Sequence, residues 1–467
     1  MEDLESQLAT TTITTTKPLP DGYSLPLWRK NAILFIVSWM ALAVTFSSTS
    51  LLPATPEIAH DIHTTSETLN VTNAGVLCVM GFSCLIWGPL NLLIGRRFSY
   101  NIAILFLCAC SVGTAVAVDM HMFTAFRVLG GLTGTSFLIS GQTILADIFE
   151  PVVRGTAVGF FMIGTVTGPA VGPCIGGVIV TYASWRIIYW LQAGMTGFAF
   201  ILSVLFVPDI NQERGSTSTV EKVDPSPRRG IAEIIRMFNP VHIMRLLIYP
   251  NILLADLTCG LLSTFQYAIL TSARSIFNPR FHLTTALVSG LFYLAPGAGF
   301  LIGSIVGGKL SDRTVRSWTV KRNGVRLPQD RLNSGLITLL GMLPVAALVY
   351  GWTLQKEIGG MVVPIVAAFF GGLALMGSFN SLNTYCAEAL PEQRREVISG
   401  KYIIQYIFAA GSSALVDPVI DRIGVGWTFT ICVAFSIIGG SLVFLITRWG
   451  LDMQRWVERR VSIDPKE

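Results

Sequence analysis

Two ionisable side chains stand inside long apolar stretches of this chain. Arg127 lies in the string FRVLGGLTG, where Gly131, one helical turn further on, leaves space beside a long side chain. Asp256 lies near the middle of the apolar string NILLADLTCGLL. Because burying a charge is costly, an ionisable group in such a stretch is a candidate for moving a proton or contacting an anion. We interpret Arg127 as a proton-coupling or anion-contacting residue and Asp256 as a proton carrier. The alternatives are that Arg127 extends its head group to a membrane interface and that Asp256 lies in a loop.

Neutral hydrogen-bonding side chains also occur in apolar stretches, where they either line a polar pathway or join helices to each other. These residues are Gln142, Asn380, Asn383, Tyr385, Gln405 and Tyr406. Arg186, which follows Trp185, is a candidate for the same pathway or for a structural cap. Arg274 and Arg280 are basic loop residues that could form an exit ring or could simply be solvated.

Other kinds of chemistry find no support in the sequence. His60 and His63, with Glu57 and Asp61, have a common spacing in an exposed loop, so we expect no metal there. The string GxxxxGK[ST] is absent, which argues against a pump driven by ATP. Paired carboxylates, a metal-ligand helix and a nucleophile elbow are also missing from the apolar stretches. We therefore expect neither a cofactor nor an enzyme.

Glycines and prolines recur with helical spacing in the apolar string GTVTGPAVGPCIGG. Its members are Gly164, Gly168, Pro169, Gly172, Pro173, Gly176 and Gly177. The four-residue spacing places small residues on one helix face, where two backbones can approach closely. We interpret the string as a tight contact between helices that can rock. The alternative is a close-packed interface with no moving role.

The composition places these residues in a membrane. Of 467 residues, 52% are hydrophobic and only 13% are charged, whereas a soluble protein has about 25% charged residues. Apolar runs long enough to span a bilayer occur twelve times, which predicts an all-α membrane protein. The polar gap at 208–245 divides the runs into six and six. We expect a disordered N-terminal tail at 1–30 and two six-helix lobes at 31–207 and 246–447. A linker at 208–245 joins the lobes, and a C-terminal tail follows at 448–467.

The distribution of Lys and Arg predicts the orientation, because basic residues concentrate in cytoplasmic loops. With both termini on one side, that side holds the basic gap at 208–245, the loop at 310–333 and several further basic residues. These are Arg96, Arg97, Arg154, Arg394, Arg395 and Lys401. The loops of the other side hold few basic residues, so we expect both termini in the cytoplasm. Asn70 begins a glycosylation sequon on the outer side, but it adjoins the membrane and we expect no glycan on it.

Several strings resemble those of the major facilitator superfamily, within it the fungal twelve-span drug:proton antiporters. GTVTGPAVGPCIGG resembles the antiporter motif of the fifth helix, FRVLGGLTG the fourth-helix motif with its embedded arginine, and LLPATPEI the proline pair that ends the first helix. GGKLSDR, with Asp312 and Arg313, resembles the loop motif of the second half. The first-half copy, GPLNLLIGRR, keeps Gly88, Gly95, Arg96 and Arg97 but has Leu92 where the family usually has aspartate. A gating latch that relies on this acid is therefore in doubt.

The strings PLWRKNAI, SGQTILADIFEP and LPQDRLNSG are similar to those of fungal itaconate exporters. The resemblance implies two lobes that rock around a midplane cavity flanked by the helices that carry Gln142, Asn380 and Gln405. It implies a monomeric plasma-membrane exporter of an itaconate-like dicarboxylate, which exchanges its substrate for protons. Three alternatives remain open: a multidrug or secondary-metabolite exporter, an importer such as a sugar porter, and a membrane enzyme. The fifth-helix motif argues against the importer.

Overall fold

The computed structural model describes residues 24–149, 151–207, 240–272, 291–390 and 393–463, and all regular structure within these ranges is helical. In the first half the elements are α2 (Leu27–Thr49), η2 (Leu52–Ala54), α3 (Thr55–Asp61), α4 (Ser66–Leu93), α5 (Arg96–Ala115), α6 (Met120–Gly131), α7 (Gly134–Ile148), α8 (Pro151–Tyr182) and α9 (Arg186–Phe206). In the second half they are α11 (Val241–Leu246), α12 (Pro250–Ser272), α15 (Leu294–Lys321), η4 (Pro328–Arg331), α16 (Leu332–Ile337), η5 (Thr338–Met342), α17 (Leu343–Lys356), α18 (Val362–Ala389), α19 (Arg394–Ile423) and α20 (Val425–Ile463).

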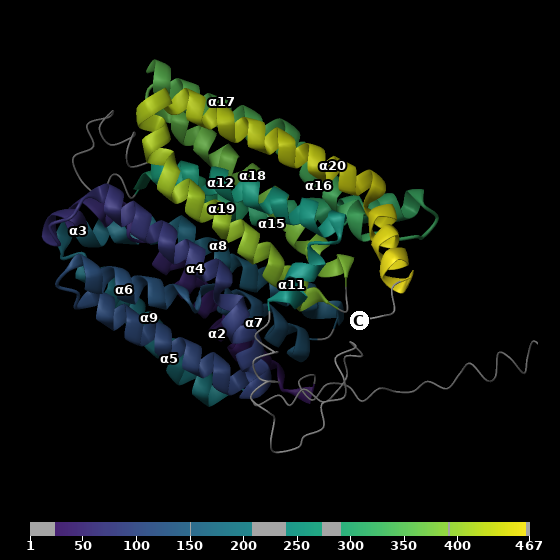
Figure 1. Cartoon of the computed structure of the whole chain (residues 1–467), viewed down its shortest axis with the longest axis horizontal. Coiled ribbons are helices and arrows are strands. Elements are labelled where there is room, and N and C mark those ends of the chain that lie inside the picture. Colours follow the sequence, from purple (N-terminus) through teal and green to yellow (C-terminus); the bar gives the residue numbers. More distant parts are fainter. Residues whose placement is uncertain (1–23, 150, 208–239, 273–290, 391–392, 464–467) are drawn as a thin grey trace, which may run out of the picture.

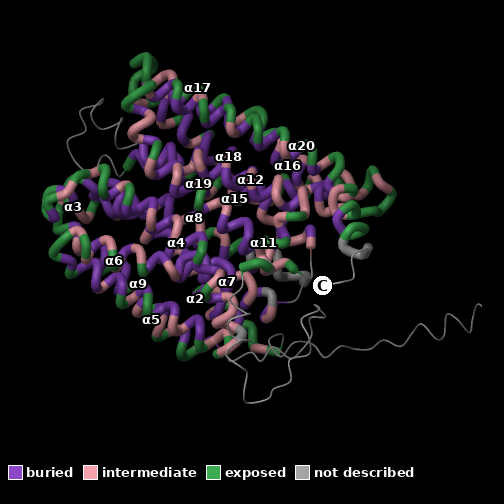
Figure 2. Tube along the Cα trace, viewed as in Figure 1, coloured by how far each residue is buried: buried purple, intermediate pink, exposed green. Residues whose placement is uncertain are grey.

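Twelve helical segments in the described residues are long and apolar enough to cross a membrane, as the sequence predicts. Some of these segments combine several elements: α2 to α3 form the first, α6 and α7 the fourth, and η4 to α17 the ninth. The long helices lie side by side (Figure 1), with buried positions concentrated where they meet (Figure 2). Large apolar side chains such as Phe35, Phe198 and Leu205 are exposed, which suits a surface surrounded by lipid.

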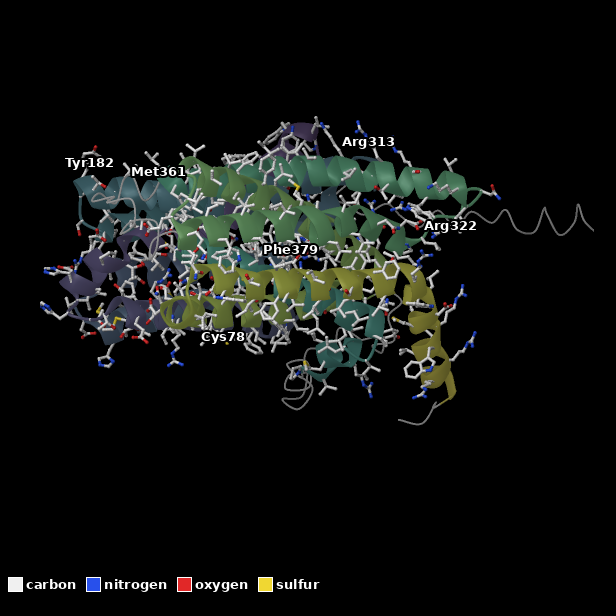
Figure 3. All side chains as sticks on the ribbon, turned by 90° about the horizontal axis from the view of Figure 1, so that it is seen from above. Cys78, Tyr182, Arg313, Arg322, Met361 and Phe379 are labelled. Atoms are coloured by element: carbon white, nitrogen blue, oxygen red, sulfur yellow. The ribbon has the colours of Figure 1, made fainter. Side chains whose placement is uncertain are left out.

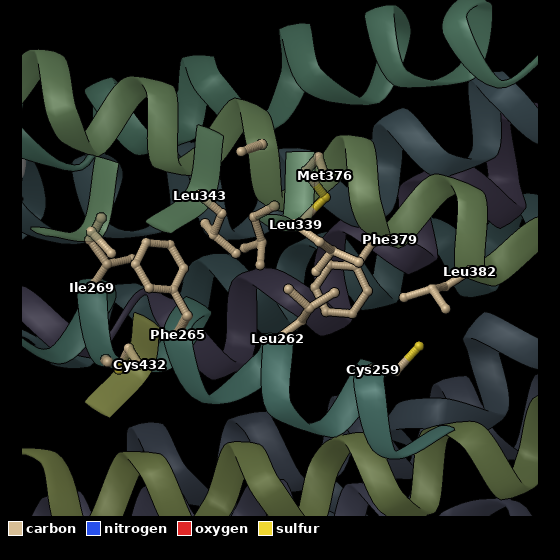
Figure 4. Close-up of a cluster of buried hydrophobic side chains, with 14 of the residues drawn as sticks. Cys259, Leu262, Phe265, Ile269, Leu339, Leu343, Met376, Phe379, Leu382 and Cys432 are labelled. Carbon is tan, nitrogen blue, oxygen red and sulfur yellow. The ribbon is translucent and has the colours of Figure 1, made fainter. Parts of the chain in front are cut away.

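Two large apolar clusters form most of the core, and each draws most of its residues from one half of the chain. One apolar cluster joins α12, α17, α18 and α20, and includes Phe265, Leu339 and Phe379 (Figure 4). A second cluster joins α2, α4, α5 and α7 of the first half with α19 of the second half, and includes Ile33, Phe137 and Tyr406. We call these two halves the N-lobe and the C-lobe. They meet mainly where α4 packs against α19 and α8 against α15, with a smaller contact between α7 and α19.

The fourth span is interrupted between α6 and α7, at Leu132 and Thr133. Three glycines surround this interruption, and glycine weakens a helix because its backbone loses more conformational freedom there than that of any other residue. The backbone there is nevertheless satisfied, since the Trp87 indole N–H donates to the carbonyl of Leu132 at 2.8 Å. A broken helix inside a membrane requires such a partner. The interruption lets α6 and α7 follow different directions, with Arg127 on α6.

The bundle has two distinct ends. Tyr182 lies at one of them, whereas Arg313 and Arg322 lie toward the other (Figure 3). We call these the Tyr182 end, which the sequence predicts to be outside the cell, and the Arg322 end, predicted to be cytoplasmic. The final helix α20 does not stop at residue 447, where the sequence places the end of the last span, but continues to Ile463.

Candidate functional site

Arg127 is a buried cation whose partners are neutral. Its side chain is on α6 and only 4% exposed. One guanidinium nitrogen, Nη1, donates to the carbonyl and the hydroxyl of Ser47 on α2, at 2.8 and 3.1 Å. The ring of Tyr189 lies 5.6 Å from the guanidinium carbon. The Nε group has no hydrogen-bond partner among the described residues. Arg127 therefore faces inward, and its charge is not paired with any described carboxylate.

Asn73 on α4 connects Arg127 to the opposite lobe. The amide oxygen of Asn73 accepts from Arg127 Nη2 at 3.2 Å, while its amide nitrogen donates to the Ser413 hydroxyl on α19 at 3.5 Å. Both Asn73 and Ser413 are buried at 2% exposure. The sequence analysis missed both residues, because small polar residues in a span carry no signal of their own. Their contact places Arg127 one side chain away from the boundary between the lobes.

Asp256 lies fully buried on α12 in the C-lobe, so it is not in a loop. The Cys386 thiol donates to its Oδ1 oxygen at 3.8 Å. Its Oδ2 oxygen has no hydrogen-bond partner in the described part of the chain. A carboxylate oxygen without a donor is poorly stabilised in its charged form, and it can accept a proton. The position is consistent with the predicted proton carrier.

Lys401 on α19 is the cation that accompanies Asp256. The sequence analysis counted it with a cytoplasmic loop, and this assignment is wrong: the side chain is only 2% exposed. Its ammonium group donates to the Asn383 side-chain oxygen at 2.6 Å and lies 3.8 Å from the centre of the Tyr402 ring. No ion pair joins Lys401 to Asp256, but the two residues are close, since Asp256 Oδ2 is 3.7 Å from the position of a Cβ on Gly400, the residue before Lys401. The neighbouring basic pair Arg394–Arg395 explains the error, since counting charges cannot tell which side chain turns inward.

The other predicted polar residues divide into two groups. Asn383 and Tyr385 belong to the Asp256 neighbourhood, where the Tyr385 hydroxyl accepts from the Asn251 amide at 3.0 Å. Asn380 instead donates to the carbonyl of Ser304 on α15 at 2.6 Å, which joins two helices. The Gln405 backbone accepts from Ser263, and Gln142 is half-buried on α7.

The glycine–proline string packs α8 against α2. Continuous helix runs through Pro169 and Pro173. A side chain at Gly168 would collide with Thr45 Oγ1, and at 2.6 Å with the amide nitrogen of Phe46. Gly164, Gly172 and Gly176 face Ser38, Thr49 and Ser50 in the same way. Thr49 also donates its hydroxyl to the Gly168 carbonyl at 3.3 Å. The close helix contact predicted from this string is present in the structure.

Arg186 lies at the Tyr182 end of the N-lobe, at the start of α9. Its guanidinium pairs with Asp61 and donates to the Ala117 carbonyl at 3.0 Å. The Trp185 indole also donates to Asp61, at 2.9 Å. These contacts match a structural cap. Glu57, His60 and Asp61 border an open surface cavity of about 480 Å³, and the described residues contain no group of three or more ligands placed for a metal. Arg274 and Arg280 lie outside the described residues.

The loop motifs hold the Arg322 end together. In the first half Arg96 pairs with Asp147, and Arg97 donates to the Val204 carbonyl at 2.7 Å. Gly95 has a φ of +84°, a conformation that favours glycine. In the second half Asp312 pairs with Arg331 at 2.9 Å, and Arg331 also pairs with Glu388 at 3.1 Å. Arg313 is exposed.

Contacts between the lobes occur at both ends of the α4–α19 pair. Near the Arg322 end, Arg395 on α19 donates to the Gly88 carbonyl on α4 at 2.8 Å. The acceptor is a backbone oxygen of the first-half loop motif, so this bond does not depend on the aspartate that Leu92 replaces. Near the Tyr182 end, the Asn70 amide donates to Asp417 Oδ2 at 2.8 Å. A glycan would attach to this same amide nitrogen; that the sequon carries none stays a prediction.

Three curated fungal proteins are similar to most of the chain. The MFS-type transporter hepF of Aspergillus oryzae is 27% identical and covers 86% of this chain and 84% of its own length. The MFS antiporter QDR3 of Candida albicans is 23% identical, over 91% of this chain and 77% of its own. The efflux pump radE of Floropilus chiversii is 25% identical, over 86% of this chain and 76% of its own.

The fold is shared with a solved transporter structure. The xylose transporter XylE from E. coli, in a partially occluded inward-open conformation, superposes with a TM-score of 0.64 over 90% of this chain and 98% of its own, at 14% identity. The family model described as Major Facilitator Superfamily matches residues 37–414. With its twelve apolar helices, this chain belongs to the Major Facilitator Superfamily of transporters.

Proposed function

We propose that the protein is a secondary active exporter that releases a small organic acid, an itaconate-like dicarboxylate, in exchange for protons. The lobes would rock against each other so that a site between them faces each end of the bundle in turn. The observation that carries this proposal is the buried guanidinium of Arg127, whose partners among the described residues are all neutral. The plasma membrane and cytoplasmic termini are part of the same proposal.

Arg127 supports an anionic substrate. A carboxylate loses much hydration when it enters a protein, and a paired cation with charge-assisted hydrogen bonds offsets that loss. Arg127 has an unused Nε donor and a planar group that can hold a carboxylate through two parallel bonds. Asn73 and Ser47 would keep the guanidinium in place while it waits for the substrate.

Asp256 and Lys401 support proton coupling. When Asp256 is ionised, the nearby ammonium group balances its charge. When Asp256 is protonated, Lys401 still has the Asn383 oxygen and the Tyr402 ring as partners. Lys401 therefore keeps its partners in both protonation states of Asp256, and the free Oδ2 oxygen of Asp256 can accept the proton. The name of the relative QDR3, an antiporter, is in keeping with exchange.

A second candidate is a multidrug or secondary-metabolite exporter. The similarity to the efflux pump radE favours it, and the aromatic residues near Arg127 would also suit an apolar compound. In that case Arg127 would hold α2, α4 and α6 together and would not contact the substrate.

Inside-out vesicles from cells that express the protein distinguish these candidates. Labelled itaconate should accumulate in the vesicles when their lumen is acidic, and accumulation should stop when the pH gradient is collapsed. A panel of hydrophobic drugs should not compete for this uptake. If itaconate uptake ignores a proton gradient of either sign, exchange for protons is disproved. Drug uptake without itaconate uptake would establish the second candidate.

A further inference from the structure

The last part of α20, residues 448–463, lies beyond the membrane-spanning part of that helix. The helix has 39 residues and is therefore about 58 Å long, whereas the hydrocarbon core of a bilayer is about 30 Å thick. The segment must therefore emerge at the Arg322 end. Its last turns bend away from the long axis of the bundle (Figure 1) and run past the edge of the bundle (Figure 3). They consequently lie where the bilayer surface surrounds the protein.

The exposed side of this segment carries two adjacent stripes. Arg448, Arg455 and Arg459 recur at helical spacing on one stripe, and all three are exposed. Trp449 and Trp456, each 49% exposed, form the other. Arg460 extends along the tryptophan stripe, with its guanidinium carbon 4.0 Å from the centre of the Trp456 ring. On the opposite side, Val457 is buried at 2% exposure, which fixes how the segment is turned.

The basic residues of this segment outnumber its acidic ones and form no ion pair with the described residues. The segment contains four arginines and two acidic residues, Asp452 and Glu458. Glu458 accepts a hydrogen bond from the Gln454 side chain at 3.0 Å. No ion pair in the described ranges involves any of the four arginines. Their contacts are with aromatic rings, those of Phe444 and Trp456.

We propose that residues 448–463 form a surface helix that binds anionic phospholipid headgroups. Tryptophan favours the level of the headgroups, because its ring is apolar and its N–H needs a polar partner. Arginine beside it would pair with lipid phosphate, and a negatively charged leaflet attracts such a segment. A protein partner fits less well, since the segment faces the space that lipid occupies. This inference depends on the chain spanning a membrane and is independent of the substrate.

The experiment compares the thermal unfolding of full-length protein in a mild non-ionic detergent with added lipids. Phosphatidylserine and phosphatidylcholine are added separately at equal concentrations, and inorganic phosphate serves as a third addition. The test variant is Arg455→Gln/Arg459→Gln. The matched control is Arg316→Gln/Lys321→Gln, which removes two exposed positive charges from the end of α15.

Phosphatidylserine should raise the unfolding temperature of the wild type and of the control more than phosphatidylcholine does. The test variant should need about thirtyfold more phosphatidylserine for half of the effect, because two charges near an anionic surface are lost. Inorganic phosphate should have no effect. The proposal is overturned if phosphatidylserine acts no better than phosphatidylcholine, if both double variants respond alike, or if inorganic phosphate reproduces the shift.

Discussion

The two lobes treat buried charge in opposite ways. The N-lobe buries Arg127 with neutral partners among the described residues. The C-lobe buries Asp256 close to Lys401, a residue of opposite charge. A buried cation without a counter-charge suits an anionic substrate that binds and is released. A carboxylate close to a cation suits a proton that binds and is released. In the proposed function, the N-lobe would contact the substrate and the C-lobe would carry the proton.

The largest expected effect comes from a change at the α8–α2 contact, which would block the proposed rocking of the lobes. Gly168→Leu should abolish transport while the protein still inserts in the membrane, because the leucine side chain would wedge α8 away from Thr45 and Phe46 on α2. Gly159→Leu on the same helix is the matched control, since nothing lies within 4 Å of a Cβ at Gly159. Vesicle uptake and membrane abundance are measured for both. Normal uptake by Gly168→Leu would reduce the string to ordinary packing.

Removing the N-lobe charge should have the next largest effect. Arg127→Gln should lower itaconate transport at least 100-fold, because the substrate carboxylate would lose its charged partner, and bonds to charged groups are worth about 1.5–3 kcal/mol each. Arg127→Lys should recover only a small part, since an ammonium cannot form two parallel bonds. Initial rates of uptake over a range of substrate concentrations measure both variants. Full activity of Arg127→Gln would remove the N-lobe from substrate contact.

Removing single charges from the C-lobe should affect stability as well as coupling. Lys401→Gln leaves Asp256 without a counter-charge, which should destabilise the protein by about 3 kcal/mol. Asp256→Asn leaves Lys401 unbalanced and should end the response to a proton gradient. The double variant Asp256→Asn/Lys401→Gln should unfold at a higher temperature than Lys401→Gln alone. If the effects of the two changes are simply additive, the two groups do not act as a pair.

The smallest expected effect concerns the contact between the lobes near the Tyr182 end. Asn70→Ala removes the bond to the Asp417 carboxylate, which is worth about 1.5 kcal/mol, so the balance between the two transport conformations should shift about tenfold. The labelling rate of a cysteine introduced beside Asp417 reports the shift. Thr68→Ala, a change in the exposed first turn of the same helix, should leave that rate unchanged. Equal labelling rates in Asn70→Ala and Thr68→Ala would show that the Asn70–Asp417 bond does not stabilise one transport conformation over the other.

The sequence predicted the twelve spans well because hydropathy is a property of each segment on its own. Arg127 and Asp256 were found for a related reason: a charge inside an apolar run is conspicuous without any knowledge of its neighbours. Lys401 was missed since it lies only six residues after Arg395, where a basic residue indicates a loop. Asn73 and Ser413 could not be found, because their importance comes from a contact between residues 340 positions apart.

Binding of itaconate to purified protein tests the division between the lobes most directly. Isothermal titration of the wild type, Arg127→Gln and Asp256→Asn measures substrate affinity apart from transport. We expect Asp256→Asn to bind within about threefold of the wild type, with an affinity that no longer varies with pH, and Arg127→Gln to show no measurable binding. The opposite pattern, with binding kept by Arg127→Gln and lost by Asp256→Asn, would contradict the account.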